Sequence, residues 1–353
     1  MKAWPKIPAP IVTVVVPAYN AEATLAETLE SALAQTCRDL EVVVVNDGSS
    51  DQTTAIAKAY AARDPRLRLI EQPNGGVARA RNTGIAAARG AYIAPLDADD
   101  LWRPDKLDRQ LKAFQSGGPD AGLAYSWSLL IDHDGNVTGA MPPAKLDGYV
   151  LHRHLAWNFI GNGSTPLVRT ELLRRHLYEP ALRDSGCEGG EDYLMQLQLA
   201  RRYGFVCAPG YLVGYRKFPG TMSSKGVAMN RSVSSVFANL EPNLSGLARA
   251  VARARQSEYL AREAGHHLTA RNWRMVARTL LQAGIYAPRV TAEWMKDRAL
   301  KRFHQEGDPA LAGKLRHFNN AGDEVAPSFD EPSTFQKMKS QLERADLSRS
   351  PFS

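Results

Sequence analysis

Cysteine is scarce in this chain of 353 residues, and the spacing of the three that occur argues against two kinds of structural site. Cys37, Cys187 and Cys207 lie far apart, and no two of them form a Cys-x-x-Cys pair. A disulfide framework or a zinc knuckle needs closely spaced cysteines, so we expect free thiols in a reducing cytoplasm. The eight histidines are also scattered, without the spacing to acids or thiols that metal ligands usually have.

Long apolar runs and the common phosphate-binding glycine motifs are also missing. No segment approaches the ~20 apolar residues that span a bilayer, and residues 1–10 contain prolines where a signal peptide has its apolar core. The chain contains neither Gly-x-x-x-x-Gly-Lys-Ser/Thr nor Gly-x-Gly-x-x-Gly. A P-loop NTPase and a classical dinucleotide enzyme are therefore not expected.

Positive charge is concentrated in one part of the chain. The formal net charge is +7, and residues 249–302 alone hold twelve Lys/Arg against four Asp/Glu, a local balance of +8. We find no motif of an RNA- or DNA-binding module and no aromatic-basic platform in the first half, so we expect no nucleic-acid partner. A basic face of this kind also suits an anionic lipid surface.

The first hundred residues alternate between short apolar runs and helical patterns. β-Branched runs at residues 11–16 and 40–45 are typical of strands that are buried on both faces. Residues 25–33 and 53–62 have apolar positions at helical spacing. This alternation predicts an α/β fold with a mostly parallel sheet flanked by helices, in which ligands bind beyond the carboxyl ends of the strands.

Polar clusters directly follow these two predicted strands and a third, at the apolar run of residues 91–96. The clusters are Tyr19 with Asn20, Asp47, and the acids Asp97, Asp99 and Asp100. Bunched carboxylates repel one another, so a fold keeps them where a cation binds or where they cap a turn. Taken alone, the acids could simply precede a helix that begins near Pro104. Their occurrence together with two other clusters at strand ends favours a ligand site.

A second pair of acids, Glu191 and Asp192, opens a predicted helix in the second half of the chain. The helix macrodipole alone could account for acids at this position. Residues 205–215 follow and predict a last pair of short strands. Two separate acid clusters could divide two tasks, binding a cation and accepting a proton.

Beyond Ser224 the pattern is purely helical. The apolar residues Trp273, Val276, Ala277, Leu280, Leu281 and Gly284 repeat with the helical period, and Arg271, Arg274 and Arg278 lie outside that stripe. This predicts an amphipathic helix that packs onto the core or docks on a membrane surface. From Glu306 onward the polar composition predicts a flexible tail with one short helix near residues 335–342.

Five motifs, taken in order, resemble the family-2 inverting glycosyltransferases with a GT-A fold. They are Val16-Pro-Ala-Tyr-Asn20, Val44-Val-Asn-Asp-Gly-Ser-Ser-Asp51, Asn74-Gly-Gly76 with Ala80-Arg-Asn82, Leu96-Asp-Ala-Asp-Asp100 and Gly190-Glu-Asp192. Each motif is weak alone, but their joint order is specific. The resemblance implies a GT-A nucleotide-diphospho-sugar transferase domain at 10–224, a helical basic extension at 225–304 and a flexible tail at 305–353.

The resemblance also implies a role for each motif residue. Pro17, Tyr19 and Glu22 would line the nucleotide base and ribose, Asp47 would bond to the base, usually uracil, and Arg81 would lie near the diphosphate or sugar. Asp97 and Asp99 would hold the ribose and a divalent cation, Mg²⁺ or Mn²⁺, with Asp99 as the direct ligand. Asp192 would be the general base, with Glu191 beside it.

Other site residues are expected around this set. Residues 161–169 would line the acceptor side, so that Trp157, Asn162 and Ser164 are candidates there. Many relatives carry a histidine after the equivalent of Arg216 that assists the metal or diphosphate. Here that position is Phe218, which leaves Arg216 and Lys217 as candidates and leaves metal dependence open.

The expected activity is transfer of a sugar from a UDP-sugar to a saccharide or lipid-linked acceptor, in surface glycan synthesis at the inner face of a membrane. Residues 246–303 would supply a peripheral membrane contact. Three other functions remain open. A nucleotidyltransferase would want a Gly-rich, Lys-bearing first loop, and a phosphatase with Asp97 as nucleophile would want Lys and Ser/Thr partners. The third is a catalytically silent module that binds nucleotide sugars.

Overall fold

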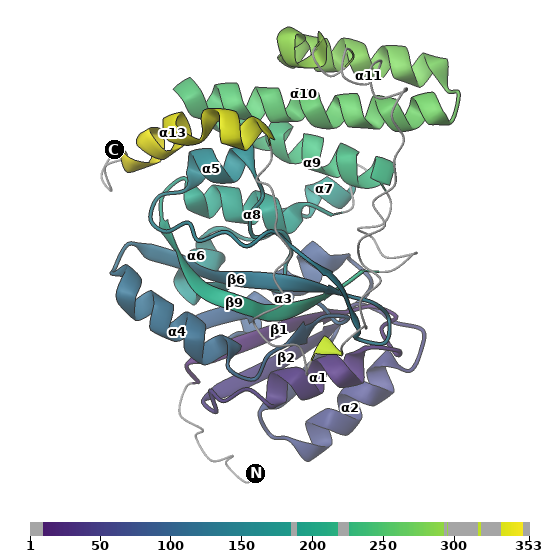
Figure 1. Cartoon of the computed structure of the whole chain (residues 1–353). Helices are drawn as coiled ribbons and strands as arrows, with labels where there is room; N and C mark the ends of the chain where they lie inside the picture. Colours follow the sequence, from purple (N-terminus) through teal and green to yellow (C-terminus); the bar gives the residue numbers. More distant parts are fainter. Residues whose placement is uncertain are drawn as a thin grey trace.

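A computed structural model describes residues 10–184, 189–217, 226–292, 295, 317–318 and 333–348 of the chain. Its centre is a mixed sheet of nine strands with helices on both faces (Figure 1). The strand order is β3-β2-β1-β4-β8-β6-β9-β5, and β7 pairs with β6 outside this path.

The N-terminal half of the sheet is parallel. It consists of β1 (Val12–Ala18), β2 (Leu40–Asn46), β3 (Leu67–Glu71) and β4 (Tyr92–Pro95), connected by α1 (Leu25–Leu33), α2 (Thr53–Arg63) and α3 (Val77–Ala87). Every residue of β1 and β2 is buried, as the β-branched runs predicted. Because β1 pairs in parallel with both β2 and β4, the loops that follow these three strands meet at one edge of the sheet.

The second half of the sheet is mixed rather than parallel. Its strands are β5 (Leu101–Trp102), β6 (Ala121–Ile131), β7 (Val137–Ala140), β8 (Leu167–Arg169) and β9 (Gly204–Arg216). Antiparallel β8 joins β4 to β6, while β9 runs parallel to β6. The predicted pair of short strands at 205–215 is wrong, because β9 is one strand of 13 residues that passes through Gly210 with a shift of register.

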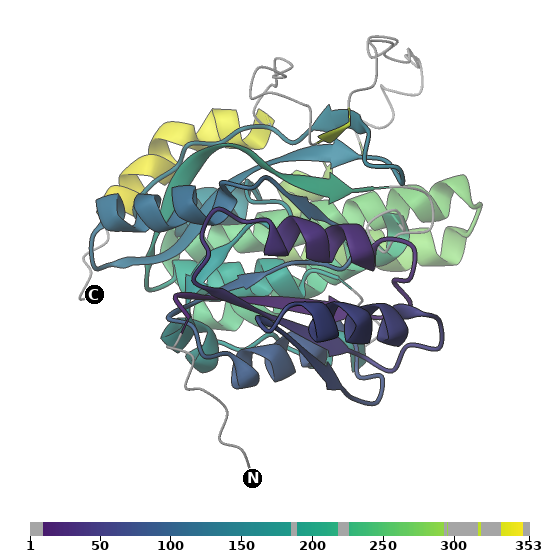
Figure 2. The ribbon, with the colours of Figure 1, turned by 90° about the horizontal axis from the view of Figure 1, so that it is seen from below.

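Two helical layers cover the sheet, and alternate residues of β1 face them. Val14 and Val16 pack toward α1, α2 and α4 (Lys106–Gly117), a layer seen from below in Figure 2. Val15 packs toward the opposite layer. That layer contains α3, α5 (Leu151–Ala156), α6 (Thr170–Arg175), α7 (Ala181–Asp184) and α8 (Glu191–Ala200).

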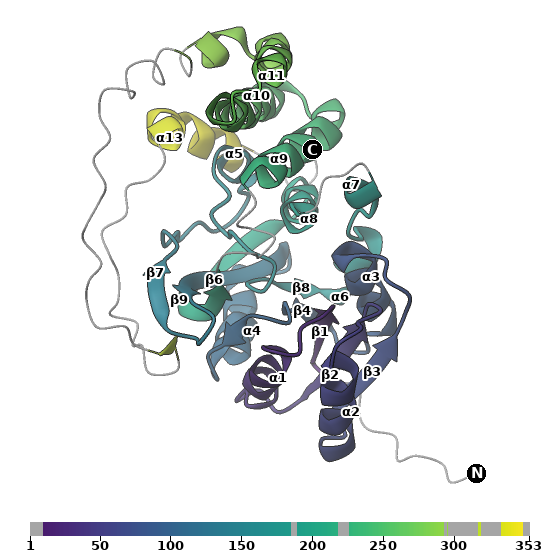
Figure 3. The ribbon, with the colours of Figure 1, turned by 90° about the vertical axis from the view of Figure 1, so that its right-hand side faces the viewer.

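The predicted helical extension continues this second layer. It consists of α9 (Gly226–Leu240), α10 (Gly246–Thr269) and α11 (Trp273–Tyr286), which lie one beyond the other above α8 (Figure 3). Phe237 of α9 and Val251 of α10 belong to the same buried cluster as Val15 of the sheet. The predicted boundary at residue 224 lies outside the described residues and stays a prediction. Within the described chain, no helix has the length and apolarity needed to cross a bilayer.

The last described helix, α13 (Ser333–Leu347), packs against α5 (Figure 1). Its Asp346 is buried and accepts hydrogen bonds from the His152 backbone N–H at 2.9 Å and from Arg153 Nε at 2.8 Å. Asp346 also lies 2.8 Å from His152 Nδ1. This helix is longer than the short helix predicted near residues 335–342. It is also packed on α5, whereas a flexible tail was predicted for this part of the chain. The buried Asp346 and Leu342, which belongs to the hydrophobic cluster of α5, hold the helix there, and composition reveals neither contact.

We expect Asp346→Ala to detach α13 from α5, because the substitution leaves the buried Arg153 without its carboxylate. Removing one partner of a buried pair costs about 3 kcal/mol or more, so amide hydrogen exchange in α13 should accelerate roughly a hundredfold. The control is Leu347→Ala on the same helix, where the side chain is 82% exposed. Equal exchange rates in the two variants would contradict this role of Asp346.

Candidate active site

A cleft of about 680 Å³ lies at the carboxyl ends of β1, β2 and β4, and ten of the fourteen predicted site residues line it. They are Pro17, Tyr19, Asp47, Arg81, Asp97, Asp99, Asn162, Glu191, Asp192 and Arg216. The four that do not line it are Glu22, Trp157, Ser164 and Lys217. The fold therefore brings together residues from Pro17 to Arg216, which lie far apart in the sequence.

Arg81 joins the two acid clusters inside this cleft. The residue lies on α3 and is 2% exposed. Its Nη2 lies 2.5 Å from Asp97 Oδ1, and its Nη1 lies 2.7 Å from Glu191 Oε1. The guanidinium also faces the ring of Tyr178, at 5.0 Å from the ring centroid. Burial alone would lower the pKa of Arg81, but these anionic neighbours hold the pKa above its ordinary value.

A glycine makes room for this ion pair. A Cβ atom added to Gly163 would lie 2.6 Å from Arg81 Nη2 and 3.1 Å from Asp97 Oδ2. Both atoms belong to a buried charged pair, so they cannot move aside cheaply. The Gly-rich segment that the sequence assigned to the acceptor side therefore also accommodates the arginine.

In each acid cluster, one carboxylate that lines the cleft is not paired with Arg81. Asp99 and Asp192 line the cleft, and neither forms an ion pair among the described residues. Burial and the neighbouring Asp97 raise the pKa of Asp99 to about 6. Burial and the neighbouring Glu191 raise the pKa of Asp192 to about 7. A carboxylate with a pKa near neutrality suits proton transfer, and one beside a second anion favours a bound cation.

Asp100, the third acid of the first cluster, has a structural role. It is fully buried and accepts hydrogen bonds from the Arg216 backbone N–H at 2.8 Å and from Ser164 Oγ at 2.5 Å. Burial, and next the charge of Asp99, raise the pKa of Asp100 well above its ordinary value. Ser164 Oγ also accepts from the Asp97 backbone N–H at 2.9 Å. Ser164, predicted on the acceptor side, thus holds the acid loop from within the core.

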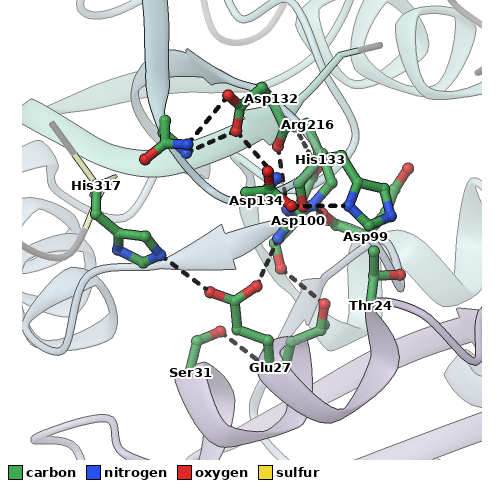
Figure 4. A network of polar contacts seen from close by, with 12 residues as sticks. Thr24, Glu27, Ser31, Asp99, Asp100, Asp132, His133, Asp134, Arg216 and His317 are labelled. Atoms are coloured by element: carbon green, nitrogen blue, oxygen red, sulfur yellow. Dashed lines mark hydrogen bonds and ion pairs between the residues drawn. The ribbon is translucent and has the colours of Figure 1, made fainter. Parts of the chain in front are cut away.

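Arg216 lies beneath the same loop, at the centre of a network of polar contacts (Figure 4). Its Nε donates to the Asp99 carbonyl at 2.6 Å, and its Nη1 donates to the carbonyls of Asp132 and His133. Its Nη2 lies 2.7 Å from Glu27 Oε2. All three guanidinium nitrogens are engaged by the protein, so Arg216 fixes the position of Asp99. Lys217 is exposed outside the cleft, and Phe218 lies outside the described residues.

Asp47 organises the part of the cleft beside the end of β2. Its carboxylate accepts hydrogen bonds from the backbone N–H groups of Gly75 and Gly76 at 2.9 and 2.7 Å, and from Gln72 Nε2 at 2.7 Å. Gly76 has a φ of 87°, which favours glycine. Asp47 therefore shapes this turn. Glu22 joins two loops outside the cleft by accepting from the Gln52 backbone N–H at 2.9 Å.

The cleft is also lined by residues that the sequence did not single out, among them His133, Arg183, Met229 and Val233. Arg183 lies beside the turn that Asp47 holds, where its Nη2 donates to Asn74 Oδ1 at 2.8 Å. His133 lies between β6 and β7, and the Asp-Gly pair that follows it was the only available signal. Met229 and Val233 come from α9, which was assigned to the extension rather than to the site. Trp157 instead packs against the core beside Phe159.

Sequence comparisons identify the family of this fold and site. The model for glycosyl transferase family 2 matches residues 13–128. An uncharacterized glycosyltransferase of Methanocaldococcus jannaschii is 30% identical over 211 residues, which cover 59% of this chain and 71% of that protein. The chain belongs to glycosyl transferase family 2, as its motifs predicted.

Other relatives are longer than the region they share with this chain. The succinoglycan biosynthesis protein ExoO of Rhizobium meliloti is 38% identical over 213 residues, 58% of this chain and 60% of ExoO. A chondroitin synthase of Escherichia coli is 41% identical over 130 residues, 36% of this chain but only 18% of the synthase. The chain thus spans from under a fifth to about three fifths of these relatives.

Two solved structures show the same fold. Staphylococcus aureus TarS 1-349 superimposes with a TM-score of 0.59 at 18% identity, over 90% of this chain and 99% of that one. The mannosyltransferase PcManGT of Pyrobaculum calidifontis, in complex with GDP-Man and Mn²⁺, gives a TM-score of 0.55 at 21% identity, over 87% and 92%. The predicted GT-A fold is confirmed.

We expect Arg81→Lys to destabilise the protein by about 3 kcal/mol, although it keeps the charge. A single ammonium cannot reach Asp97 and Glu191 together, so one buried carboxylate loses its partner. Urea unfolding measures the loss. The matched control is Arg79→Lys, the same substitution on an exposed position of the same helix, which should change stability by less than about 0.5 kcal/mol. Equal stabilities would refute the bridging role.

Proposed function

We propose that this protein is an inverting glycosyltransferase that moves a sugar from a nucleotide sugar to an acceptor hydroxyl. One observation carries the proposal: a single cleft holds two acid clusters that Arg81 joins, and in each cluster one carboxylate that lines the cleft has no ion pair among the described residues. Inverting transfer is a single displacement in which the hydroxyl attacks the anomeric carbon opposite the leaving diphosphate. It needs one carboxylate to accept a proton and positive charge at the leaving group.

Asp192 is the general base in this proposal, and Glu191 is not. The carboxylate of Glu191 is held 2.7 Å from Arg81, so it is engaged in that ion pair. Asp192 has no such partner among the described residues, and its pKa of about 7 matches proton transfer near neutral pH. Glu191 acts on the reaction through Asp192, because its charge contributes to that raised pKa.

The residues at the other acid cluster fit a divalent cation that is shared with the substrate. Among the described residues, no three His, Cys, Asp or Glu side chains are grouped to hold a metal on their own. Mg²⁺ and Mn²⁺ at such sites commonly take one or two carboxylates together with substrate phosphates. Asp99, with the second oxygen of Asp97, would be those protein ligands. When bound, the ion would neutralise charge on the leaving diphosphate.

The donor would be a nucleoside diphosphate sugar, and we favour a UDP-sugar. Pro17, Tyr19 and the turn that Asp47 holds line the end of the cleft next to the first acid cluster. TarS 1-349 has been solved with UDP-GlcNAc and PcManGT with GDP-Man, which supports a nucleotide-sugar donor. The acceptor would be a saccharide or a lipid-linked saccharide in surface polysaccharide synthesis, with residues 246–303 in peripheral contact with the inner membrane face.

A panel of nucleotide sugars, each with and without Mn²⁺, tests this proposal. Transfer or slow hydrolysis of one donor, together with a rise in melting temperature on binding, is the expected result. Nucleoside diphosphate binding without turnover of any donor would favour a catalytically silent binding module. Release of pyrophosphate from a nucleoside triphosphate would instead favour a nucleotidyltransferase.

Asp192→Asn should lower the rate of transfer by 10²- to 10⁴-fold, the usual contribution of a general base. Donor affinity, measured by calorimetry, should stay within about twofold because Asp192 lies in the second acid cluster. The matched control is Asp105→Asn, a half-buried acid outside the cleft that should retain full activity. Near-normal transfer by Asp192→Asn would exclude it as the base.

The pH profile should follow the ionisation of Asp192. Since a base must be deprotonated, kcat/KM should rise tenfold per pH unit below about pH 7 and level off above it. Glu191→Gln removes a neighbouring negative charge and leaves Arg81 less neutralised, so both effects should shift the midpoint to lower pH. An upward shift, or no shift, would contradict this assignment.

A further inference from the structure

The positive charge of the helical extension is unevenly compensated. On α10, Arg249 pairs with Glu241, while Arg255 and Arg262 both pair with Glu258. From residue 264 to residue 292 the chain has no acidic residue at all. The four arginines in this stretch form no ion pair among the described residues: Arg271, Arg274, Arg278 and Arg289. The excess charge found in the sequence is therefore concentrated on α11 and its flanks.

The same helix exposes large apolar side chains. Trp273, Leu281 and Ile285 are 64%, 71% and 66% exposed. Leu281 and Ile285 are four residues apart and share a face of α11 with Arg274 and Arg278. Thr279 and Ala283 are buried on the other side of the helix, against α10. The predicted apolar stripe is therefore divided, with Trp273 and Leu281 facing outward together with two of the arginines.

The position of α11 leaves this face open. Among the described elements, the helix packs closely only on α10 and is the outermost one at that end of the molecule (Figures 1 and 3). We propose that its outer face, consisting of Trp273, Arg274, Arg278, Leu281 and Ile285, docks on an anionic lipid surface. Apolar side chains that enter the interface between lipid headgroups and acyl chains, beside arginines that contact headgroup phosphates, are the features of interfacial helices.

A second copy of the same face is a poorer partner. A twofold interface is isologous, so the same patch meets itself. Arginines of one copy would then approach those of the other, and no acidic residue occurs on α11 or its flanks to compensate them. An anionic lipid surface offers complementary charge and an apolar layer at the same place.

The geometry relates this face to the cleft. Met229 and Val233 of α9 line the cleft, α9 packs on α10, and α10 packs on α11. Two helix spacings of 8–10 Å put α11 within about 20 Å of the cleft wall. Only at this point does the inference rest on the proposed function, because a lipid-linked acceptor held at the surface would then lie within reach of Asp192.

Co-sedimentation of the full chain with vesicles tests the inference. The protein should pellet with vesicles of equal parts phosphatidylglycerol and phosphatidylcholine, but not with pure phosphatidylcholine. Arg274→Gln with Arg278→Gln should weaken partitioning about 25-fold, roughly fivefold for each arginine. Leu281→Ser with Ile285→Ser should weaken it at least about tenfold. The charge-matched control, Arg38→Gln with Arg63→Gln on exposed positions of the other end, should bind like the wild type.

Three results would overturn the inference. They are no pelleting with either vesicle, equal loss in the charge-matched control, or a concentration-dependent dimer in sedimentation velocity that Leu281→Ser with Ile285→Ser dissociates. Nucleotide-sugar binding, measured by melting temperature without vesicles, should be unchanged in all of these variants. Loss of that binding alone, with vesicle binding retained, would count against the proposed function and not against the lipid surface.

Discussion

The contact of Arg81 with Asp97 and Glu191 is the interaction on which the site depends. One buried guanidinium joins the loop after β4 to the start of α8, and so fixes two parts of the chain that approach only in the folded state. Because Arg81 pairs with one acid of each cluster, it also determines which carboxylates stay available. Of the carboxylates that line the cleft, this leaves Asp99 and Asp192 without an ion pair among the described residues. In the proposed reaction, Asp99 serves the diphosphate and Asp192 serves the acceptor, and this division follows from the pairing of Arg81.

Arg216 stabilises the same loop through hydrogen bonds to its backbone and to Asp100. Burying several carboxylates together is costly unless hydrogen bonds and opposite charges compensate them. Arg216 donates its side-chain hydrogens mainly to backbone carbonyls, and its backbone N–H to Asp100. It thus shapes the loop without forming an ion pair with its acids. Among the described residues, the five acids of the two clusters share one direct cationic partner, Arg81. This surplus of negative charge is the physical reason for expecting a divalent cation.

Much of the fold follows from local patterns, whereas the roles of individual polar residues do not. The β-branched runs of β1 and β2 predicted buried strands, and parallel pairing then brought Tyr19, Asp47 and Asp97 to one edge. Ser164 could not be assigned correctly, because its hydrogen bond to Asp100 crosses 64 positions of the sequence. The docking of α13 was missed for the same reason, since the contact of Asp346 with Arg153 crosses 193 positions. Periodicity describes the neighbours along one element and contains no information about such distant partners.

The helical extension is part of the site rather than an addition to it. Gly190, directly before the acid pair, has a φ of 85°, and a Cβ atom there would lie 3.1 Å from Val236 of α9. The turn that aims Glu191 and Asp192 into the cleft is thus packed against α9, which itself lines the cleft through Met229 and Val233. Helices α9 and α10 share one buried cluster with α8, the helix that carries Asp192. A displacement of the outer helices would therefore be transmitted to α8. Anchoring α11 on a surface would orient the cleft through the same packing that positions Asp192.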